Sequence, residues 1–147
     1  MLAERLALEE YRFDAQFASP LKRASEVAEI IAGKLGVEVI LDPRLRELRT
    51  GKVAGLTPVE AARVQPEPPG GYRTYEPIPE GESTIDHYAR SLSSYCELLD
   101  KHLADSVCVV AHGGTLGHLL RIIYGNPVNS PIVGRGYLCF MNGDTAR

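Results

Sequence analysis

The chain has 147 residues, of which 44% are hydrophobic and 24% charged, and this composition is typical of one globular domain spanning residues 1–147. Sixteen basic and nineteen acidic residues give a formal net charge of −3, which argues against the broad basic surface that binds nucleic acid or an anionic membrane. No apolar run approaches the roughly 18 residues of a spanning helix, and the opening residues are too charged for a signal peptide, so we expect a cytoplasmic protein.

The first part of the chain is predicted to alternate helices and strands. Residues 1–11 have a helical pattern of leucines, and no capping residue precedes them, so the chain is expected to begin inside an element. A short aromatic strand over 13–19 leads into a helix over 21–35, which Gly36 ends. A second strand is expected over 37–41.

The middle of the chain combines an irregular stretch, a short helix and a long loop. Residues 44–52 are basic and irregular, and they carry Glu47. A helix is predicted to begin at 57–60, where threonine and glutamate have capping-box spacing and proline takes the first helical position. Residues 65–81 hold five prolines and three glycines, so we expect no regular element there.

The later part of the chain is predicted to form a helix, a strand and a second helix. A capping box at 83–86 opens a long helix. The next strand, over 107–111, is nearly continuously apolar, which is typical of a strand buried on both faces. Residues 112–114 are predicted to turn the chain into a helix over 115–124. The long helix has one apolar face, formed by Ile85, Ala89, Leu92, Cys96, Leu99 and Leu103.

Near the carboxyl end, residues 137–141 are predicted to form a last strand. The Asn142-Gly143 pair that follows is a hairpin signal with four residues after it, so the returning strand is expected to be cut short. The alternation of helices and strands along the chain predicts an α/β domain of three layers, with a mostly parallel sheet between two layers of helices.

Two strand–turn–helix units carry the residues best suited to chemistry. Arg23 lies in the first turn of the helix over 21–35, and His112 directly follows the apolar strand over 107–111. Ligands of parallel sheets bind at the carboxyl ends of the strands, where helix amino termini point free amides at anions. The sequence therefore indicates an anionic ligand, such as a small phosphate ester. The alternatives are a surface arginine and a structural turn histidine.

Other site types have little support in the sequence. The His-Gly-Gly triplet also occurs in oxyanion loops of serine hydrolases, but the chain has no Gly-x-Ser-x-Gly nucleophile motif and no nucleotide-binding glycine loop. His87 and His102 are expected on polar helix faces, and His118 has the wrong spacing from His112 to share a metal with it. Neither a metal nor a disulfide is predicted, because the three cysteines, Cys96, Cys108 and Cys139, lie in apolar runs as buried side chains.

Four stretches of the sequence resemble, in order, the motifs of the histidine phosphatase superfamily, the phosphoglycerate mutase-like proteins. Residues 13–29, with Ser19-Pro20-Leu21-Lys22-Arg23-Ala24, are similar to the second-arginine motif of that family. Residues 42–60 are similar to its acidic-residue motif, residues 81–90 to the start of its late helix, and residues 109–114 to its second-histidine motif. Four motifs in the family's order are a far more specific signal than any one of them.

The resemblance implies a phosphoglycerate mutase-like fold and a role for each matching residue. Arg23 would bind the phosphoryl group, and His112 would stabilise it during transfer, with Gly113 letting backbone amides approach the anion. Glu47 would donate a proton to the leaving group. The reaction would pass through a phosphohistidine that water hydrolyses, without metal or cofactor.

The sequence departs from the family's pattern at the nucleophile. The family carries its nucleophilic histidine in an Arg-His-Gly motif after the first strand, and no Arg-His-Gly occurs in the 147 residues. The family's first strand is therefore expected to be absent from this chain, a loss of roughly 30 residues, which is the size of a strand and its crossover. A missing interior strand would favour pairing between two copies of the chain.

Two functions remain open from the sequence. The first is a phosphatase, with mutase activity less favoured, acting on a small phosphate ester. The second is a protein that binds phosphate or a partner without catalysis, because it lacks the nucleophile. Tyr72, Arg73 and Tyr75 are candidates for residues that cover the substrate, with an ordinary surface loop as the alternative.

Overall fold

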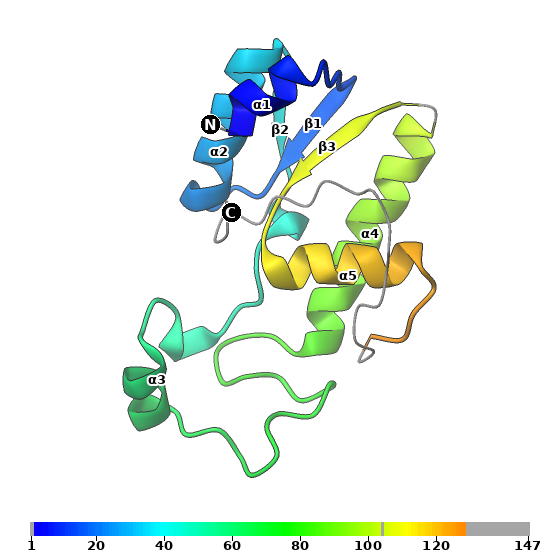
Figure 1. The fold of residues 1–147 in the computed structure, drawn as a ribbon. Coiled ribbons are helices and arrows are strands. Elements are labelled where there is room, and N and C mark those ends of the chain that lie inside the picture. The colour runs from blue at the N-terminus through cyan, green and yellow to red at the C-terminus, as the bar shows by residue number, and fades with distance from the viewer. Residues whose placement is uncertain (1, 104, 129–147) are drawn as a thin grey trace.

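The computed structural model describes residues 2–103 and 105–128, which form helices and strands in alternation (Figure 1). Two short 3-10 turns, Pro43–Leu45 and Gly51–Val53, follow the second strand. The helices and strands are α1 (Leu2–Leu8), β1 (Ala15–Ala18), α2 (Lys22–Leu35), β2 (Val39–Leu41), α3 (Pro58–Val64), α4 (Thr84–His102), β3 (Val107–Val110) and α5 (Gly113–Ile123).

The three strands form one parallel sheet in the order β2-β1-β3. Phe17 in the central strand lies opposite Ile40 on one side and Val109 on the other. Because all three strands run in the same direction, their carboxyl ends meet at one edge of the sheet. This arrangement confirms the predicted α/β fold with a parallel sheet.

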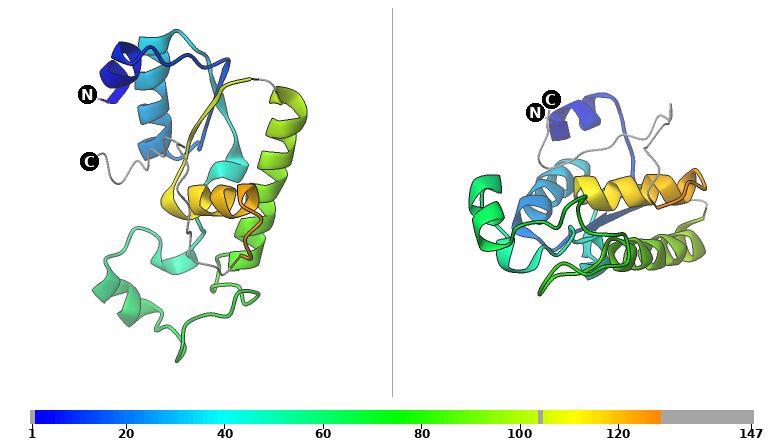
Figure 2. Two further views of the ribbon diagram at one scale, coloured as in Figure 1. Left: turned by 45° about the vertical axis from the view of Figure 1, so that its right-hand side comes forward. Right: turned by 90° about the horizontal axis from the view of Figure 1, so that it is seen from below.

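Helices cover both faces of the sheet, as Figure 1 and the turned views of Figure 2 show. Ala18, Cys108 and Val110 point to one face, where they pack against α1 and α2. Phe17 and Val109 point to the other face, where they join a cluster with residues of α4 and α5. Side chains alternate along each strand, so β1 and β3 contribute to both hydrophobic clusters and lie between the two helical layers.

The structure confirms the helix ends that were predicted from a terminal glycine or from a capping box. Gly36 ends α2 in the left-handed conformation, with φ 73°, and its amide donates to the carbonyl of Ala32. Thr57 and Glu60 form a capping box at the start of α3, and Ser83 and Asp86 form another at the start of α4.

The prediction of a turn at residues 112–114 is wrong in its boundary, because α5 already begins at Gly113 with His112 as its N-cap. His112 keeps the extended conformation of the strand, with φ −125°, and both glycines take part in the first helical turn. The predicted burial of the preceding strand on both faces is also wrong: Cys108 and Val110 are buried, whereas Val107 and Val109 are half-buried.

Helix α4 packs with its polar face toward the protein. Its buried residues are His87, Ser91 and Ser94, so His87 lies on the polar face of the helix as expected, but this face is turned inward. The buried polar groups have partners, because Ser94 donates to Asp42 at 2.8 Å and Ser91 to the carbonyl of His87 at 2.9 Å. The apolar face is exposed, including Cys96, which was expected to be buried; its residues are Ile85, Ala89, Leu92, Cys96, Leu99 and Leu103.

Residues 46–83 extend from the carboxyl edge of the sheet as a lobe that contains α3 (Figures 1 and 2). The segment over 65–81 has no helix or strand, as predicted. The predicted strand and hairpin over 137–143 and Cys139 lie outside the described residues. Within the described part of the chain, no helix has the length and apolar character needed to cross a membrane.

Candidate active site

The two strand–turn–helix units meet at the carboxyl edge of the sheet. Ser19 follows β1, and its amide donates to the carbonyl of Val110 at the end of β3, at 2.9 Å. His112 is 2% exposed, and its Nε2 lies 2.8 Å from Ser19 Oγ. The hydroxyl of Ser19 also accepts the amide of Leu21, at 3.3 Å. The start of α2 and the start of α5 are therefore joined through the side chain of His112.

Glu47 lies at the first turn of α5. Its Oε2 accepts the amide of Gly114 at 3.0 Å, and its Oε1 accepts the amide of Leu48 at 2.9 Å. A Cβ at position 114 would overlap Oε1 of Glu47, so a larger residue there would displace the carboxylate from its present position. The carboxylate is partly exposed, with 28% of the side chain accessible. It is thus held at the first turn of α5, two residues after His112, while remaining open to solvent.

The backbone around Glu47 is held by Arg90 of α4. The guanidinium donates to the carbonyls of Arg44 at 2.7 Å, Arg46 at 2.6 Å and Glu47 at 2.9 Å. It also pairs with Glu82, at 2.6 Å, which is 5% exposed. Burial raises the pKa of Glu82, but hydrogen bonds from Arg90 and the Arg49 amide outweigh it and hold the pKa below its ordinary value. The loop that presents Glu47 is therefore clamped by a charged pair.

His87 of α4 lies behind the carboxylate of Glu47. Its Nε2 is 2.9 Å from Thr115 Oγ1 and 3.9 Å from Glu47 Oε1. The Thr115 hydroxyl gives its single proton to the carbonyl of Arg46, at 2.8 Å, so it must accept from His87. This assigns the Nε2–H form to His87.

Two buried imidazoles occupy this region, since His118 packs edge-on against His87 with ring centroids 4.7 Å apart. Burial, followed by the charges of Arg90 and His118, lowers the pKa of His87 to about 4. Burial, followed by the charge of Arg121, lowers the pKa of His118 to about 4. Both rings are therefore neutral near pH 7. The sequence did not reveal this pair, because His87 and His118 belong to two different helices and their contact depends on how these helices pack.

Arg23 and Glu47 line the same cavity, which has a volume of about 450 Å³. Arg46 and Arg49 also line it, whereas His112 and Gly113 are not among its lining residues. Arg23 is exposed in the first turn of α2. The structure thus brings Arg23 and Glu47 together in one cavity, whereas His112 is buried between the starts of α2 and α5.

The loop residues predicted to cover the substrate lie elsewhere. Tyr72 accepts a hydrogen bond from Gln65 at 3.1 Å and lines a separate cavity of about 320 Å³ against α3. Arg73 donates to the hydroxyl of Tyr75 at 3.0 Å. None of Tyr72, Arg73 and Tyr75 lines the cavity that contains Arg23 and Glu47.

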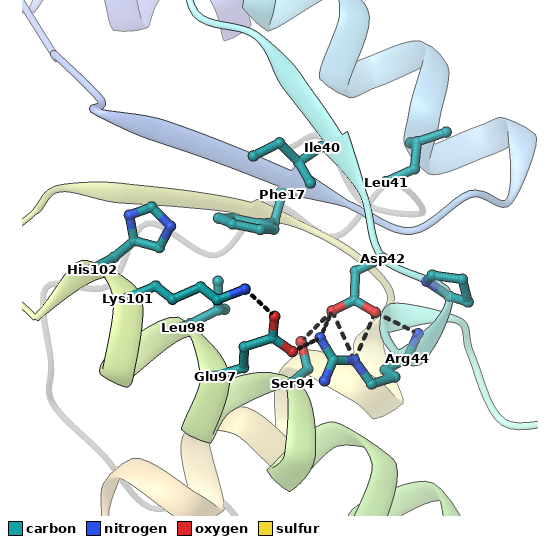
Figure 3. Close-up of a pocket in the computed structure, with 11 residues that line it drawn as sticks. Phe17, Ile40, Leu41, Asp42, Arg44, Ser94, Glu97, Leu98, Lys101 and His102 are labelled. Atoms are coloured by element: carbon teal, nitrogen blue, oxygen red, sulfur yellow. Dashed lines mark hydrogen bonds and ion pairs between the residues drawn. The ribbon is translucent and has the colours of Figure 1, made fainter.

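A third cavity, of about 530 Å³, lies between the sheet and α4 and contains none of the predicted site residues (Figure 3). Its apolar side chains include Phe17 and Leu98. Its charged groups form one connected set, in which Arg44 pairs with Asp42 and Glu97, and Glu97 with Lys101. Because these charges neutralise one another, the cavity presents no free group for chemistry. Nor does the described part of the chain gather three or more metal-ligating side chains.

Comparisons with known proteins identify similar chains. The profile of the Histidine phosphatase superfamily (branch 1) matches residues 1–134. Phosphoglycerate mutase-like protein 4 of Arabidopsis thaliana is 38% identical over 123 residues, which are 80% of this chain and 53% of that protein. Metal-independent phosphoserine phosphatase of the same plant is 38% identical over 128 residues, which are 84% of this chain and 52% of that protein. The chain therefore spans about half the length of these two relatives.

Solved structures show the same fold. Bacillus stearothermophilus YhfR aligns with a TM-score of 0.73 at 30% identity, covering 88% of this chain and 66% of that one. A mycobacterial glucosyl-3-phosphoglycerate phosphatase aligns with a TM-score of 0.71 at 29% identity, covering 86% of this chain and 64% of that one.

Proposed function

The chain belongs to the histidine phosphatase superfamily, and from this premise we propose that its site takes part in the hydrolysis of a small-molecule phosphate monoester. The observation that carries the proposal is the meeting of His112, Ser19 and the Glu47–Gly114 contact at one edge of the sheet. Relatives that bear the names of phosphatases and of phosphoglycerate mutase-like proteins support the same reaction class.

Each residue has a role that follows from its chemistry. Arg23 would bind the phosphoryl oxygens with its planar guanidinium, and His112 and the amino terminus of α5 at Gly113 would stabilise the charge during transfer. Glu47 would give a proton to the leaving oxygen, because its carboxylate is fixed but partly exposed in the same cavity as Arg23.

By the pattern of the family, the covalent step would transfer the phosphoryl group to a histidine of an Arg-His-Gly motif while the leaving oxygen takes the proton of Glu47, and water would then hydrolyse the phosphohistidine. We assign the nucleophile to none of the four histidines of this chain, since the sequence contains no Arg-His-Gly motif. His87 and His118 lie on helices and are buried, and His102 pairs with Asp105 at 2.8 Å.

Hydrolysis of 4-nitrophenyl phosphate by the purified protein tests the proposal. Turnover should fall at least about 100-fold in His112→Ala and in Arg23→Ala, which is the usual effect of removing one group that stabilises transferred charge. Lys22→Ala is the matched control, because Lys22 lies beside Arg23 and its side chain is 87% exposed, and it should keep its turnover. Turnover that survives the loss of His112 and Arg23 would contradict the assignment.

The second candidate function is phosphate binding without catalysis, because Arg23 and the amino terminus of α5 could hold an anion without a nucleophile. Its signature is binding of orthovanadate that depends on Arg23, without any turnover of the aryl phosphate. The intact mass of the same preparation should be measured first, because it fixes which polypeptide is being assayed.

We also propose that two copies of the chain associate through the exposed apolar face of α4. Leu92, Leu99 and Leu103 are 36%, 40% and 82% exposed along this face, and an apolar stripe of this kind is typical of an interface. Light scattering after size-exclusion chromatography should give twice the monomer mass, and Leu92→Glu should give a monomer. A wild-type monomer at concentrations of tens of micromolar would contradict this proposal.

A further inference from the structure

We propose that Arg46 is a specificity-determining residue that binds a second anionic group of the substrate, so that the site prefers phosphate esters with another negative charge. This inference rests on the proposed function, because it assumes that Arg23 holds the phosphoryl group. It concerns a side chain to which the proposed reaction gives no role.

More arginines line the cavity than the one that the proposed reaction assigns to the phosphoryl group. Three guanidinium groups, those of Arg23, Arg46 and Arg49, line it together with Glu47 and Glu80. Glu80 is offset by Lys52, whose Nζ lies 2.9 Å from Glu80 Oε1. Once Glu47 acts as the proton donor and Arg23 takes the phosphoryl group, the remaining lining charge is positive.

Arg46 is the guanidinium that is left for a further anion. Arg49 lies 3.6 Å from the buried carboxylate of Glu82 and is partly engaged there. Among the residues that the structure describes, no ion pair or hydrogen bond involves the guanidinium of Arg46, which is exposed. A planar fork of donors without a protein partner, beside the proposed acid, suits the oxygens of a carboxylate or another phosphate.

The backbone of Arg46 is fixed more tightly than that of a surface residue. Its carbonyl accepts from Thr115 Oγ1 at 2.8 Å and from Arg90 Nη1 at 2.6 Å. The side chain therefore extends from a rigid backbone position next to Glu47. When it binds an anion, it loses less conformational freedom than an arginine on a mobile loop would lose.

The test compares three ligands that share a phosphate–O–CH2 unit and differ in the group attached to it: phosphoglycolate carries a carboxylate, ethyl phosphate a methyl group and phosphoethanolamine an aminomethyl group that is positively charged. Dissociation constants are measured by calorimetry, or as inhibition constants against an aryl phosphate, at 0.15 M salt. The wild-type protein should bind phosphoglycolate about tenfold more tightly than ethyl phosphate, as expected for one charge-assisted contact in a partly exposed site. Phosphoethanolamine should bind most weakly.

Arg46→Gln should reduce the preference for phosphoglycolate over ethyl phosphate to about twofold or less, and Arg49→Gln should reduce it by a smaller factor. Arg63→Gln, on the exposed surface of α3 outside the cavity, is the control and should keep the wild-type ratio. The ratio of the two dissociation constants is the informative quantity, because the loss of any positive charge weakens the binding of all three ligands.

The outcomes separate this inference from the proposed function. If the wild-type protein binds phosphoglycolate and ethyl phosphate equally, or if Arg46→Gln keeps the full preference, Arg46 does not determine specificity and the proposed function stands. If none of the three ligands binds, the proposed function fails and this inference fails with it.

Discussion

His87 and His118 keep two neutral imidazoles inside the molecule, next to the residues that present Glu47. A histidine whose pKa is about 4 in the folded protein and 6.5 as its ordinary value binds fewer protons folded than unfolded across that interval. The folded state is therefore favoured when both histidines are neutral, and the free energy of unfolding reaches its full value only above pH 6.5.

We expect the free energy of unfolding to decrease as the pH falls from 6.5 toward 4. Each histidine contributes on the order of 1 to 3 kcal/mol, because a lowered pKa stabilises above the unfolded value and the stabilisation is lost as the folded value is approached. Urea denaturation at intervals of half a pH unit measures the slope, and His118→Phe should lower it by about half. A stability that is flat between pH 6.5 and 4.5 would show that the two rings bind protons as readily in the folded state as in the unfolded state.

The sequence pointed to the charged and strand-end residues of the candidate site, but not to the buried residues that hold them in place. Arg23 and His112 could be found because each lies at the end of a strand or the start of a helix, whereas Glu47 was found only through the resemblance of residues 42–60 to the acidic-residue motif of the family. The contact between His87 and Thr115 joins residues 28 positions apart on two helices, and only the packing of α4 against α5 brings them together. Spacing within one helix carries no information about such a partner.

At the scale of elements, α4 shows how a helix can bury its polar side. The pattern of leucines indicated the apolar face correctly, but burial depends on partners from other segments, namely Asp42, the carbonyls of residues 44–47 and Thr115. Since the buried groups at this contact are hydrogen-bonded, the polar face can pack without a large desolvation cost. Helix caps, by contrast, depend on neighbours three residues away, which is why Gly36 and the Ser83–Asp86 box were predictable.

The clamp between α4 and the loop before Glu47 leads to a prediction for Arg90. Arg90→Leu should lower the free energy of unfolding by about 2 to 4 kcal/mol, because it removes the close charge partner of the buried carboxylate of Glu82 and leaves the carbonyls of Arg44 and Glu47 without their donor. Chemical denaturation measures the change. Lys101→Leu on the same helix is the control: its pair with Glu97 is exposed, so the cost should stay below about 1 kcal/mol.

A double-mutant cycle separates the clamp from the general loss of an arginine. If Glu82→Gln is introduced together with Arg90→Leu, the combined cost should be smaller than the two single costs added, since no buried charge is then left alone. Additive costs would mean that Arg90 and Glu82 stabilise the fold independently and do not act together as a clamp.

At the scale of the whole molecule, the described chain consists of a sheet with two hydrophobic clusters and a lobe that is attached at the sheet's carboxyl edge. Strand β1 pairs on both sides and is mostly buried, and Leu45 at the root of the lobe is 0% exposed within one cluster. Helix α3 in the lobe has seven residues and none is buried. A short helix without buried contacts can open while the sheet remains folded.

We therefore expect amide hydrogen exchange to divide the molecule into two parts. Amides of β1 should exchange only when the whole sheet unfolds, whereas amides of α3 should exchange at least about 100-fold faster through local opening. Leu45→Ala, which should remove about 2 to 5 kcal/mol from the cluster beneath the sheet, is expected to speed exchange in β1 and leave α3 unchanged. If α3 instead exchanges at the rate of β1, or accelerates together with it in this variant, the lobe unfolds with the sheet as one cooperative unit.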